Sequence, residues 1–318
     1  MRSSVLTVSR KLKFYQLVIL DQVVQSGSLV RAAQVLNMTQ PSVTKVIHEI
    51  ESYFSAPLLV RSNRGVRLTE LGELVLRRAR TMLAELRALT DEVDAYKEGI
   101  SGHVVVGTLI SASTSLLPLA LRLLKERAPQ VLVSIRIGQF DQLLPALVVG
   151  EVDLVIGRVP DDWRGREETR TLSVDQLYDE RLSIVGGTRH PLHEQAVLDL
   201  ADLHSYPWIL PPPGSLLRRT VNGLFADANL ALPTNVIESL SVLTNVALMQ
   251  DQKTVGLLPS ETARQLSGHG GIRSFNVCTP LHFGGIGCFY ANSRNLGPAA
   301  KLFRECTQLA SERHVIPD

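Results

Sequence analysis

The sequence predicts an α+β protein of several domains: a small helical head, a long helix and a body of two α/β lobes. Three observations support this fold class. A basic stretch near the N-terminus has the pattern of two helices joined by a tight turn, and an uninterrupted run of helix formers follows it. From His103 onward, strand and helix patterns alternate to the end of the chain. At 318 residues and 45% apolar content, the chain can fill several hydrophobic cores.

The N-terminal head is predicted to be a helix-turn-helix preceded by another helix. Residues 11–25 have the pattern of an amphipathic helix that Gly27 ends. Ser28 can cap a short second helix, and Thr39 can cap a longer third helix that has Pro41 in its first turn. Apolar residues of the third helix recur at spacings of four, three and four, which predicts a buried stripe of Val43, Ile47, Ile50 and Phe54.

The outward face of the third helix and the segment after it are polar and basic. Residues 57–69 predict two short strands around a turn at 62–65, which would form a wing beside the helix. Residues 1–67 hold nine Lys/Arg and three Asp/Glu, a net charge of +6, whereas the rest holds 24 and 28, a net charge of −4. This arrangement suits the major groove and phosphates of duplex DNA, although a helical pair alone could be an ordinary solvated hairpin. The candidate DNA-binding residues are Arg31, Gln40, Pro41, Ser42, Thr44, Lys45, Arg61, Arg64 and Arg67.

Residues 12–72 resemble the winged helix-turn-helix domain of LysR-type transcriptional regulators. The resemblance is carried by Phe14, Ala32-Ala33, Thr39-Gln40-Pro41-Ser42-Val43-Thr44, Ile47, Ile50, Leu58-Leu59-Val60-Arg61 and Leu68-Thr69-Glu70-Leu71-Gly72. Thr39 and Thr44 stand where the family usually has Ser, and Leu71 stands where Ala is common. The resemblance implies a regulator that binds promoter DNA, dimerises through a linker helix and responds to a small co-inducer. Its effector domain would be built like a type II periplasmic substrate-binding protein.

The segment from Glu70 to Glu98 predicts one long helix, because it contains no proline and no glycine after Gly72. Its apolar residues recur with a heptad period at Val75, Ala79, Met82, Leu86, Leu89, Val93 and Tyr96. Such a seam either packs on its own domain or pairs with a second copy, and two-fold DNA sites favour pairing. We therefore expect a homodimer through this helix, with a homotetramer as its further assembly. Residues 99–102 would form a hinge.

The body is predicted to be an effector domain of two lobes. Strands are expected at 103–107, 131–137, 153–157, 206–210, 234–237, 254–258, 272–277 and 281–290. Helices are expected at 114–127, 142–149, 216–228, 240–250, 260–266 and 299–313. A break at 163–171 separates lobe I, about 102–171 and 277–318, from lobe II, about 172–276. The expected domains are therefore a winged helix-turn-helix at 1–69, a linker helix at 70–99 and an effector domain at 100–318.

A small ligand is expected at the carboxyl ends of the strands, between the lobes. The candidate effector-binding residues are Leu109, Ser111, Ala112, Ser113, Gln139, Phe140, Arg158, Pro213, Gly214, Ser215, Glu238 and Ser239. Arg158 and two helix starts favour a small organic anion. The alternatives are that the serines only cap helices and that Arg158 pairs with Asp161 or Glu238.

Other classes of protein have less support in the sequence. No apolar run approaches the roughly 20 residues of a membrane span, and the N-terminus lacks a signal-peptide core. Three cysteines without metal-type spacing indicate the reducing cytoplasm. We find no nucleophile elbow, Walker loop, dinucleotide fingerprint or zinc-protease motif, so we expect neither an enzyme nor a cofactor. His190 and His193 could be a pair of metal ligands, but a surface loop is the plainer interpretation. The remaining alternatives are a solute-binding module and an enzyme with an appended helix-turn-helix.

Overall fold

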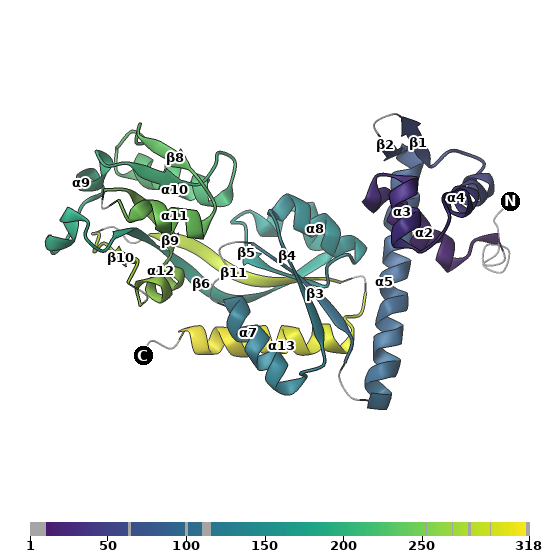
Figure 1. Cartoon of the computed structure of the whole chain (residues 1–318). Coiled ribbons are helices and arrows are strands. Elements are labelled where there is room, and N and C mark those ends of the chain that lie inside the picture. The colour runs from purple at the N-terminus through teal and green to yellow at the C-terminus, as the bar shows by residue number, and fades with distance from the viewer. Residues whose placement is uncertain are drawn as a thin grey trace.

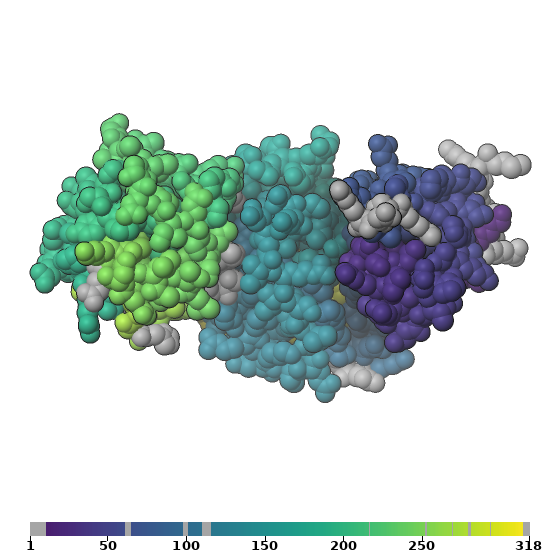
Figure 2. Space-filling view, turned by 45° about the horizontal axis from the view of Figure 1, so that its top comes forward, coloured from purple at the N-terminus to yellow at the C-terminus, as the bar shows by residue number. Residues whose placement is uncertain are grey.

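The computed structural model describes residues 11–62, 65–98, 101–109, 116–251, 253–268, 270–278, 281–292 and 294–315. Figure 1 shows the head, lobe I and lobe II in a row, with the long helix α5 (Glu70–Glu98) between the head and lobe I. The space-filling view shows lobe I, in teal, between the purple and blue head and the green lobe II (Figure 2). The predicted class, α+β with several domains, is confirmed. No helix in the described ranges is both long and apolar enough to cross a membrane.

The head contains three helices, α2 (Phe14–Ser26), α3 (Leu29–Val35) and α4 (Gln40–Phe54). Both predicted N-caps are present. The Ser28 hydroxyl accepts a hydrogen bond from the Arg31 amide, and the Thr39 hydroxyl accepts one from the Ser42 amide at 3.3 Å. The predicted stripe of α4 forms the core of the head, because three of its members are fully buried, namely Val43, Ile47 and Ile50.

The wing is an antiparallel pair of short strands, β1 (Leu59–Ser62) and β2 (Gly65–Leu68). The Val66 amide donates a hydrogen bond of 3.1 Å to the Gly27 carbonyl, so the wing is tied to the turn between α2 and α3. Gly65 has φ +116°, and a Cβ atom there would lie 2.7 Å from the Gly27 oxygen. Glycine is therefore required at this position for both conformation and space.

Helix α5 is partly covered by its own chain. Near its start, Leu76 and Ala79 are buried, and Ala84 is buried where the helix passes lobe I. Farther along, the predicted heptad seam is exposed at Met82, Leu86, Leu89, Val93 and Tyr96, with Tyr96 93% exposed. The interpretation that the seam packs on its own chain therefore holds only for its start. The first part packs within the chain, and the described residues leave the rest uncovered.

Lobe I is built on three parallel strands in the order β4-β3-β5, which are β4 (Leu132–Ile137), β3 (His103–Thr108) and β5 (Leu154–Arg158). Helices α7 (Leu116–Arg127) and α13 (Pro298–Val315) pack on one face of this sheet. Helix α8 (Phe140–Val149) packs on the other face (Figure 1). Two core clusters, one on each face, explain why successive residues of β3 are all buried. The break predicted at 163–171 consists of two short 3-10 helices, Trp163–Gly165 and Glu167–Arg170.

Two long strands connect the lobes, β6 (Leu172–Gly187) and β11 (His282–Ala291). The sequence interpretation missed β6 and placed the lobe boundaries at about 171/172 and 276/277, several residues before the crossings that the core clusters indicate. Leu172 and Tyr178 lie in lobe I cores, whereas Leu182 lies in the lobe II core. On the returning strand, Phe283 packs in lobe II and Ile286 packs in lobe I. The chain therefore crosses within these strands, and the two lobes share one nine-stranded sheet.

Lobe II continues that sheet in the order β6-β9-β7-β8, with β9 (Val255–Pro259), β7 (Trp208–Leu210) and β8 (Val236–Glu238), and β10 (Ile272–Ser274) pairs with β6. Its helices are α9 (Leu200–His204), α10 (Leu216–Asp227), α11 (Val242–Met249) and α12 (Ser260–Ser267), and a 3-10 helix spans Pro191–Glu194. Trp208 and Phe225 are fully buried at its centre. The carboxyl ends of the parallel strands β7 and β9 face lobe I, which sets up a site between the lobes.

Candidate functional site

The exposed face of α4 carries four of the predicted DNA-binding residues. Gln40, Pro41, Ser42 and Lys45 are exposed, and the first turn of the helix contains no acidic residue. Thr44 differs from the others, because its Oγ1 atom is enclosed and has no hydrogen-bond partner among the described residues. Its hydroxyl therefore does not lie on the exposed face.

Acidic side chains near the end of α4 are held away from this face. The Glu51 carboxylate accepts hydrogen bonds from the Leu58 and Leu59 amides, at 2.9 and 3.2 Å, and so fixes the entry to the wing. The Glu49 carboxylate accepts a hydrogen bond of 2.9 Å from the Gln16 side chain. These contacts leave the N-terminal half of α4 without a nearby free carboxylate of its own helix.

Basic residues flank α4 on both sides. Arg31 on α3 and Arg67 on β2 are exposed, and neither they nor Lys45 form an ion pair with any described residue. Their charges are thus available to phosphates. The side chain of Arg61 and the whole of Arg64 lie outside the described residues, so the structure does not test their predicted roles.

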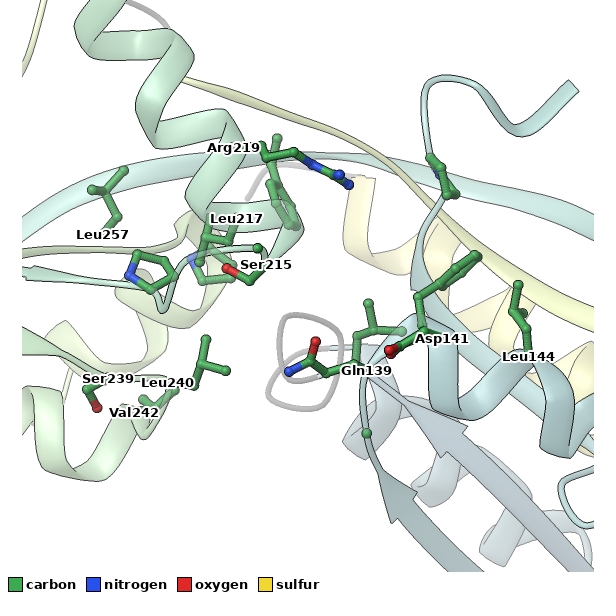
Figure 3. Close-up of a pocket in the computed structure, with 18 of the residues that line it drawn as sticks. Gln139, Asp141, Leu144, Ser215, Leu217, Arg219, Ser239, Leu240, Val242 and Leu257 are labelled. Atoms are coloured by element: carbon green, nitrogen blue, oxygen red, sulfur yellow. The ribbon is translucent and has the colours of Figure 1, made fainter. Parts of the chain in front are cut away.

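A cavity of about 730 Å³ lies between the lobes and is lined by the ends of strands and starts of helices from both. Figure 3 shows Gln139, Asp141 and Leu144 of lobe I facing Ser215, Leu217, Arg219 and Leu240 of lobe II across open space. Six of the predicted effector-binding residues line it, namely Leu109, Gln139, Phe140, Gly214, Ser215 and Ser239. Pro213, Glu238 and Arg158 are not among the lining residues, and Ser111, Ala112 and Ser113 lie outside the described residues.

The prediction that Arg158 binds the ligand is not supported by its surroundings. Arg158 is only 7% exposed, and its Nε atom donates a hydrogen bond to the Phe283 carbonyl. One guanidinium nitrogen lies 3.0 Å from each Asp161 oxygen, as the alternative interpretation proposed. The Arg158 guanidinium also lies 5.2 Å from the centre of the Phe283 ring. Arg158 therefore ties the end of β5 to β11 at the crossing between lobes. Glu238, for its part, pairs with Arg218 at 3.1 Å.

The charged residues of the cavity are ones that the sequence interpretation missed. Three arginines line it, Arg77 of α5, Arg166 and Arg219, together with the acids Asp141 and Glu168. This gives an excess of one positive charge among the described lining residues. Arg219 stands one turn after the predicted Ser215 cap, which is the only sequence signal that could have found it.

Arg166 and Arg219 differ in how they are held. Arg166 donates a hydrogen bond of 3.0 Å to Asp162, and this bond holds the pKa of that carboxyl below its ordinary value. The charge of Arg219 also lowers the pKa of Asp162. Arg219 has no ion pair with a described residue, and Figure 3 shows its guanidinium extended into the gap. Arg219 is thus an available cation at the mouth of the cavity, and Arg77 likewise forms no ion pair with a described residue.

The serines that line the cavity act as caps and turn residues. The Ser215 hydroxyl accepts a hydrogen bond from the Arg218 amide at 3.1 Å and lies 2.9 Å from the Pro212 oxygen, to which it donates. The Ser239 hydroxyl accepts a hydrogen bond of 3.1 Å from the Ser241 amide. The interpretation of these serines as helix caps therefore holds for Ser215, whereas the N-cap of α11 is Ser241 and not Ser239. Most of the remaining wall is apolar, including Leu144, Leu217, Leu240, Val242 and Leu257.

The two histidines considered as metal ligands have structural contacts in lobe II. The His190 Nδ1 atom accepts a hydrogen bond from the Leu192 amide, and its Nε2 atom lies 3.2 Å from the Lys253 oxygen. The His193 Nε2 atom lies 3.0 Å from the Gly187 oxygen. Burial lowers the pKa of both rings. These contacts occupy both ring nitrogens of His190 and the Nε2 atom of His193, which a metal would otherwise use.

The N-terminal and C-terminal parts of the chain each match a known family. Residues 14–73 match the family described as bacterial regulatory helix-turn-helix protein, lysR family, and residues 97–310 match the LysR substrate binding domain. The HTH-type transcriptional regulator GbpR of Rhizobium radiobacter is 33% identical over 246 residues, which cover 77% of this chain and 80% of that protein.

Solved structures show the same fold. Full-length OxyR C199D from Pseudomonas aeruginosa superposes with a TM-score of 0.72 at 21% identity, covering 94% of this chain and 95% of that chain. Full-length CbnR in complex with its target DNA superposes with a TM-score of 0.65 at 21% identity, covering 94% of this chain and all (100%) of that chain. The chain has a winged helix-turn-helix head and an effector domain, and its relatives are regulators and not enzymes. It therefore belongs to the LysR family of DNA-binding transcriptional regulators.

Proposed function

We propose that this regulator binds pseudo-palindromic promoter DNA as a homodimer and that a small organic anion between its lobes modulates the binding. The observation that carries the proposal is the cavity between the lobes, with apolar walls and an unpaired arginine, Arg219, at its mouth. A cleft of this size suits a small organic molecule. The arginine favours one that carries a negative charge.

Within the head, α4 and the wing have different tasks. Gln40, Pro41, Ser42 and Lys45 lie on the exposed start of α4, so we assign them to base edges and adjacent phosphates. Four arginines precede or follow that helix along the chain, and we assign them to phosphates or to the minor groove: Arg31, Arg61, Arg64 and Arg67. Thr44 would act through its packing, since its hydroxyl is enclosed.

The exposed part of the α5 seam supports dimerisation. The described residues leave open an apolar row along α5, which consists of Met82, Leu86, Leu89, Val93 and Tyr96. Pairing of two such rows would bury them and hold two heads at a fixed distance, as a two-fold DNA site requires. A homotetramer, as the further assembly, would join two such dimers. A regulator of this kind acts where the chromosomal DNA lies, so we place it in the cytoplasm, and its proposed action requires no cofactor.

The effector would act by changing the balance between two arrangements of the lobes. It can do so only through a difference in its affinity for the two arrangements. Because the Arg219 side chain of lobe II extends into the gap between the lobes, an anion bound to it would form a new contact between them. Lobe I in turn contacts α5, which carries the head.

Calorimetry with the full-length protein tests the effector class. We expect small organic acids to bind at least about tenfold more tightly than their neutral amides, since charge-assisted hydrogen bonds are stronger than neutral ones. The variant Arg219→Gln should lose this preference. Arg170→Gln is the matched control, because Arg170 is exposed and does not line the cavity. Equal affinity for acids and amides, or a preference that survives Arg219→Gln, would contradict the proposal.

A further inference from the structure

The lobe II wall of the cavity contains a buried amide whose oxygen has no partner among the described residues. Asn245 of α11 is only 6% exposed and lines the cavity. Its Oδ1 atom is fully enclosed, and no described residue donates a hydrogen bond to it. Buried acceptors in folded proteins nearly always have a partner, so an exception inside a cavity calls for an explanation.

The surroundings of Asn245 are almost entirely apolar. Between Val242 and Met249, Asn245 stands on the stripe by which α11 packs inward, at spacings of three and four. The nearby ends of β7 and β9 contribute Ile209 and Leu258 to the same cavity. An aliphatic residue would fill this position of the stripe at less cost, because burying an unpaired amide is unfavourable.

The polar groups on the lobe II wall of the cavity come from different elements. At the mouth, Arg219 offers a positive charge. Of the other polar lining groups on lobe II, Ser215 and Ser239 have backbone partners, and Thr262 is not without a partner either. Asn245 lies on the wall made by α11, apart from the α10 position of Arg219. A ligand whose charge lies at Arg219 would therefore present a different part of itself to Asn245.

From this we propose that Asn245 selects effectors that carry a hydrogen-bond donor, a hydroxyl or amino group, in addition to their acidic group. The Asn245 side chain, which lines the cavity, turns its Oδ1 atom toward this donor, the carbon skeleton packs on the apolar walls, and the acid meets Arg219. The effector class is thus hydroxy- or amino-substituted organic acids. This inference rests on the proposed function and narrows the chemistry of the same cavity.

The unfolding temperature of the ligand-free protein tests the unpaired state of the amide. The variant Asn245→Leu keeps the branching and number of the side-chain heavy atoms and removes the enclosed acceptor. We expect its unfolding temperature to rise by about 2–4 °C, since an unpaired buried polar group is replaced by an apolar one. Asn222→Leu is the control, because Asn222 is exposed and accepts a hydrogen bond of 3.1 Å from Arg218. An unchanged or lower unfolding temperature for Asn245→Leu would overturn the proposal.

Binding of matched acids tests the selection itself. The probes are benzoate, cyclohexanecarboxylate and hexanoate, each compared with its hydroxy and methoxy derivatives by calorimetry on the full-length protein. A hydroxyl can donate and a methoxy group cannot, so we expect the best hydroxy acid to bind about tenfold to a hundredfold more tightly than its ether. Asn245→Leu should abolish this preference, and Asn222→Leu should keep it.

The outcomes separate this inference from the proposal on which it rests. Ethers that bind as tightly as the alcohols, or a hydroxyl preference that persists in Asn245→Leu, would overturn the role of Asn245. Neutral alcohols that bind as well as hydroxy acids would contradict the anionic effector and leave the role of Asn245 standing. If no acid binds, the unfolding temperature of Asn245→Leu still decides whether the amide is unpaired.

Discussion

Arg80 on helix α5 joins two acidic residues that are far apart in the chain. Its Nε atom donates a hydrogen bond of 2.8 Å to Asp21 of α2, and another nitrogen pairs with Glu151, which follows α8 of lobe I. All three side chains are shielded, with 22% of Arg80, 18% of Asp21 and 23% of Glu151 exposed. One guanidinium therefore connects the head, the linker helix and lobe I.

The effect of replacing Arg80 by methionine can be worked from these contacts. Each charge-assisted bond would contribute roughly 1.5–3 kcal/mol if its loss left the partner unpaired. Neither acid would be left unpaired. Glu151 also lies 3.3 Å from Arg136, and Asp21 also accepts a hydrogen bond of 3.0 Å from Gln25. We therefore expect a loss of about 1–2 kcal/mol, which shifts the docking of α5 on lobe I by a factor of about 5–30.

Hydrogen exchange measures this shift directly. Amides of α8, which packs against α5, should exchange about 5–30 times faster in Arg80→Met than in the unmodified protein if docking protects them. Arg78→Met is the matched control, because Arg78 is exposed on the same helix and has no ion pair with a described residue. Unchanged exchange in Arg80→Met, or equal acceleration in both variants, would refute the reasoning.

Three further predictions follow from single residues. In gel shifts over a range of salt, Lys45→Ala should relax sequence preference, whereas Arg67→Ala should weaken binding to all duplexes and flatten the salt dependence. The reverse pattern would contradict the assignment of α4 to bases and of the flanking arginines to phosphates. Gly150 has φ +82°, and a Cβ atom there would lie 2.4 Å from the Ala84 Cβ. Gly150→Ala should therefore lower the free energy of unfolding by about 1–3 kcal/mol, measured by chemical denaturation. An unaltered denaturation midpoint would refute this. Burial raises the pKa of Glu180 from 4.5 to about 7, so the folded state holds this proton more tightly than the unfolded state. The stability that it contributes is full below pH 4.5 and is lost as pH rises through about 7; Glu180→Gln should flatten this fall in unfolding free energy, and an unchanged profile would contradict it.

Local patterns in the sequence were sufficient to predict the head. The caps Ser28 and Thr39 and the stripe of α4 depend on residues at most a few positions apart, and the structure confirms them. The strands and helices of the lobes were also predictable from their apolar periodicity. Strand β6 was missed because apolar and polar residues do not alternate regularly along its first half. One face of the strand is partly exposed there.

The site depended on contacts between distant segments, which local patterns do not contain. Arg158 meets Phe283, 125 residues away, and this contact removes it from the cavity. Arg219 and Asn245 become lining residues only when the two lobes face each other. The strand-end rule correctly located the cavity, and it found the backbone turns around it better than the side chains that carry its chemistry.

The claim that ligand binding between the lobes controls DNA binding by the head is tested most directly by footprinting. The full-length protein is bound to the DNA upstream of its own gene, with and without an acid that calorimetry has shown to bind. The account predicts protection of two half-sites on one face of the duplex, and a change in their spacing or extent when the acid is added. Protection that is absent, or identical with and without the bound acid, would contradict it.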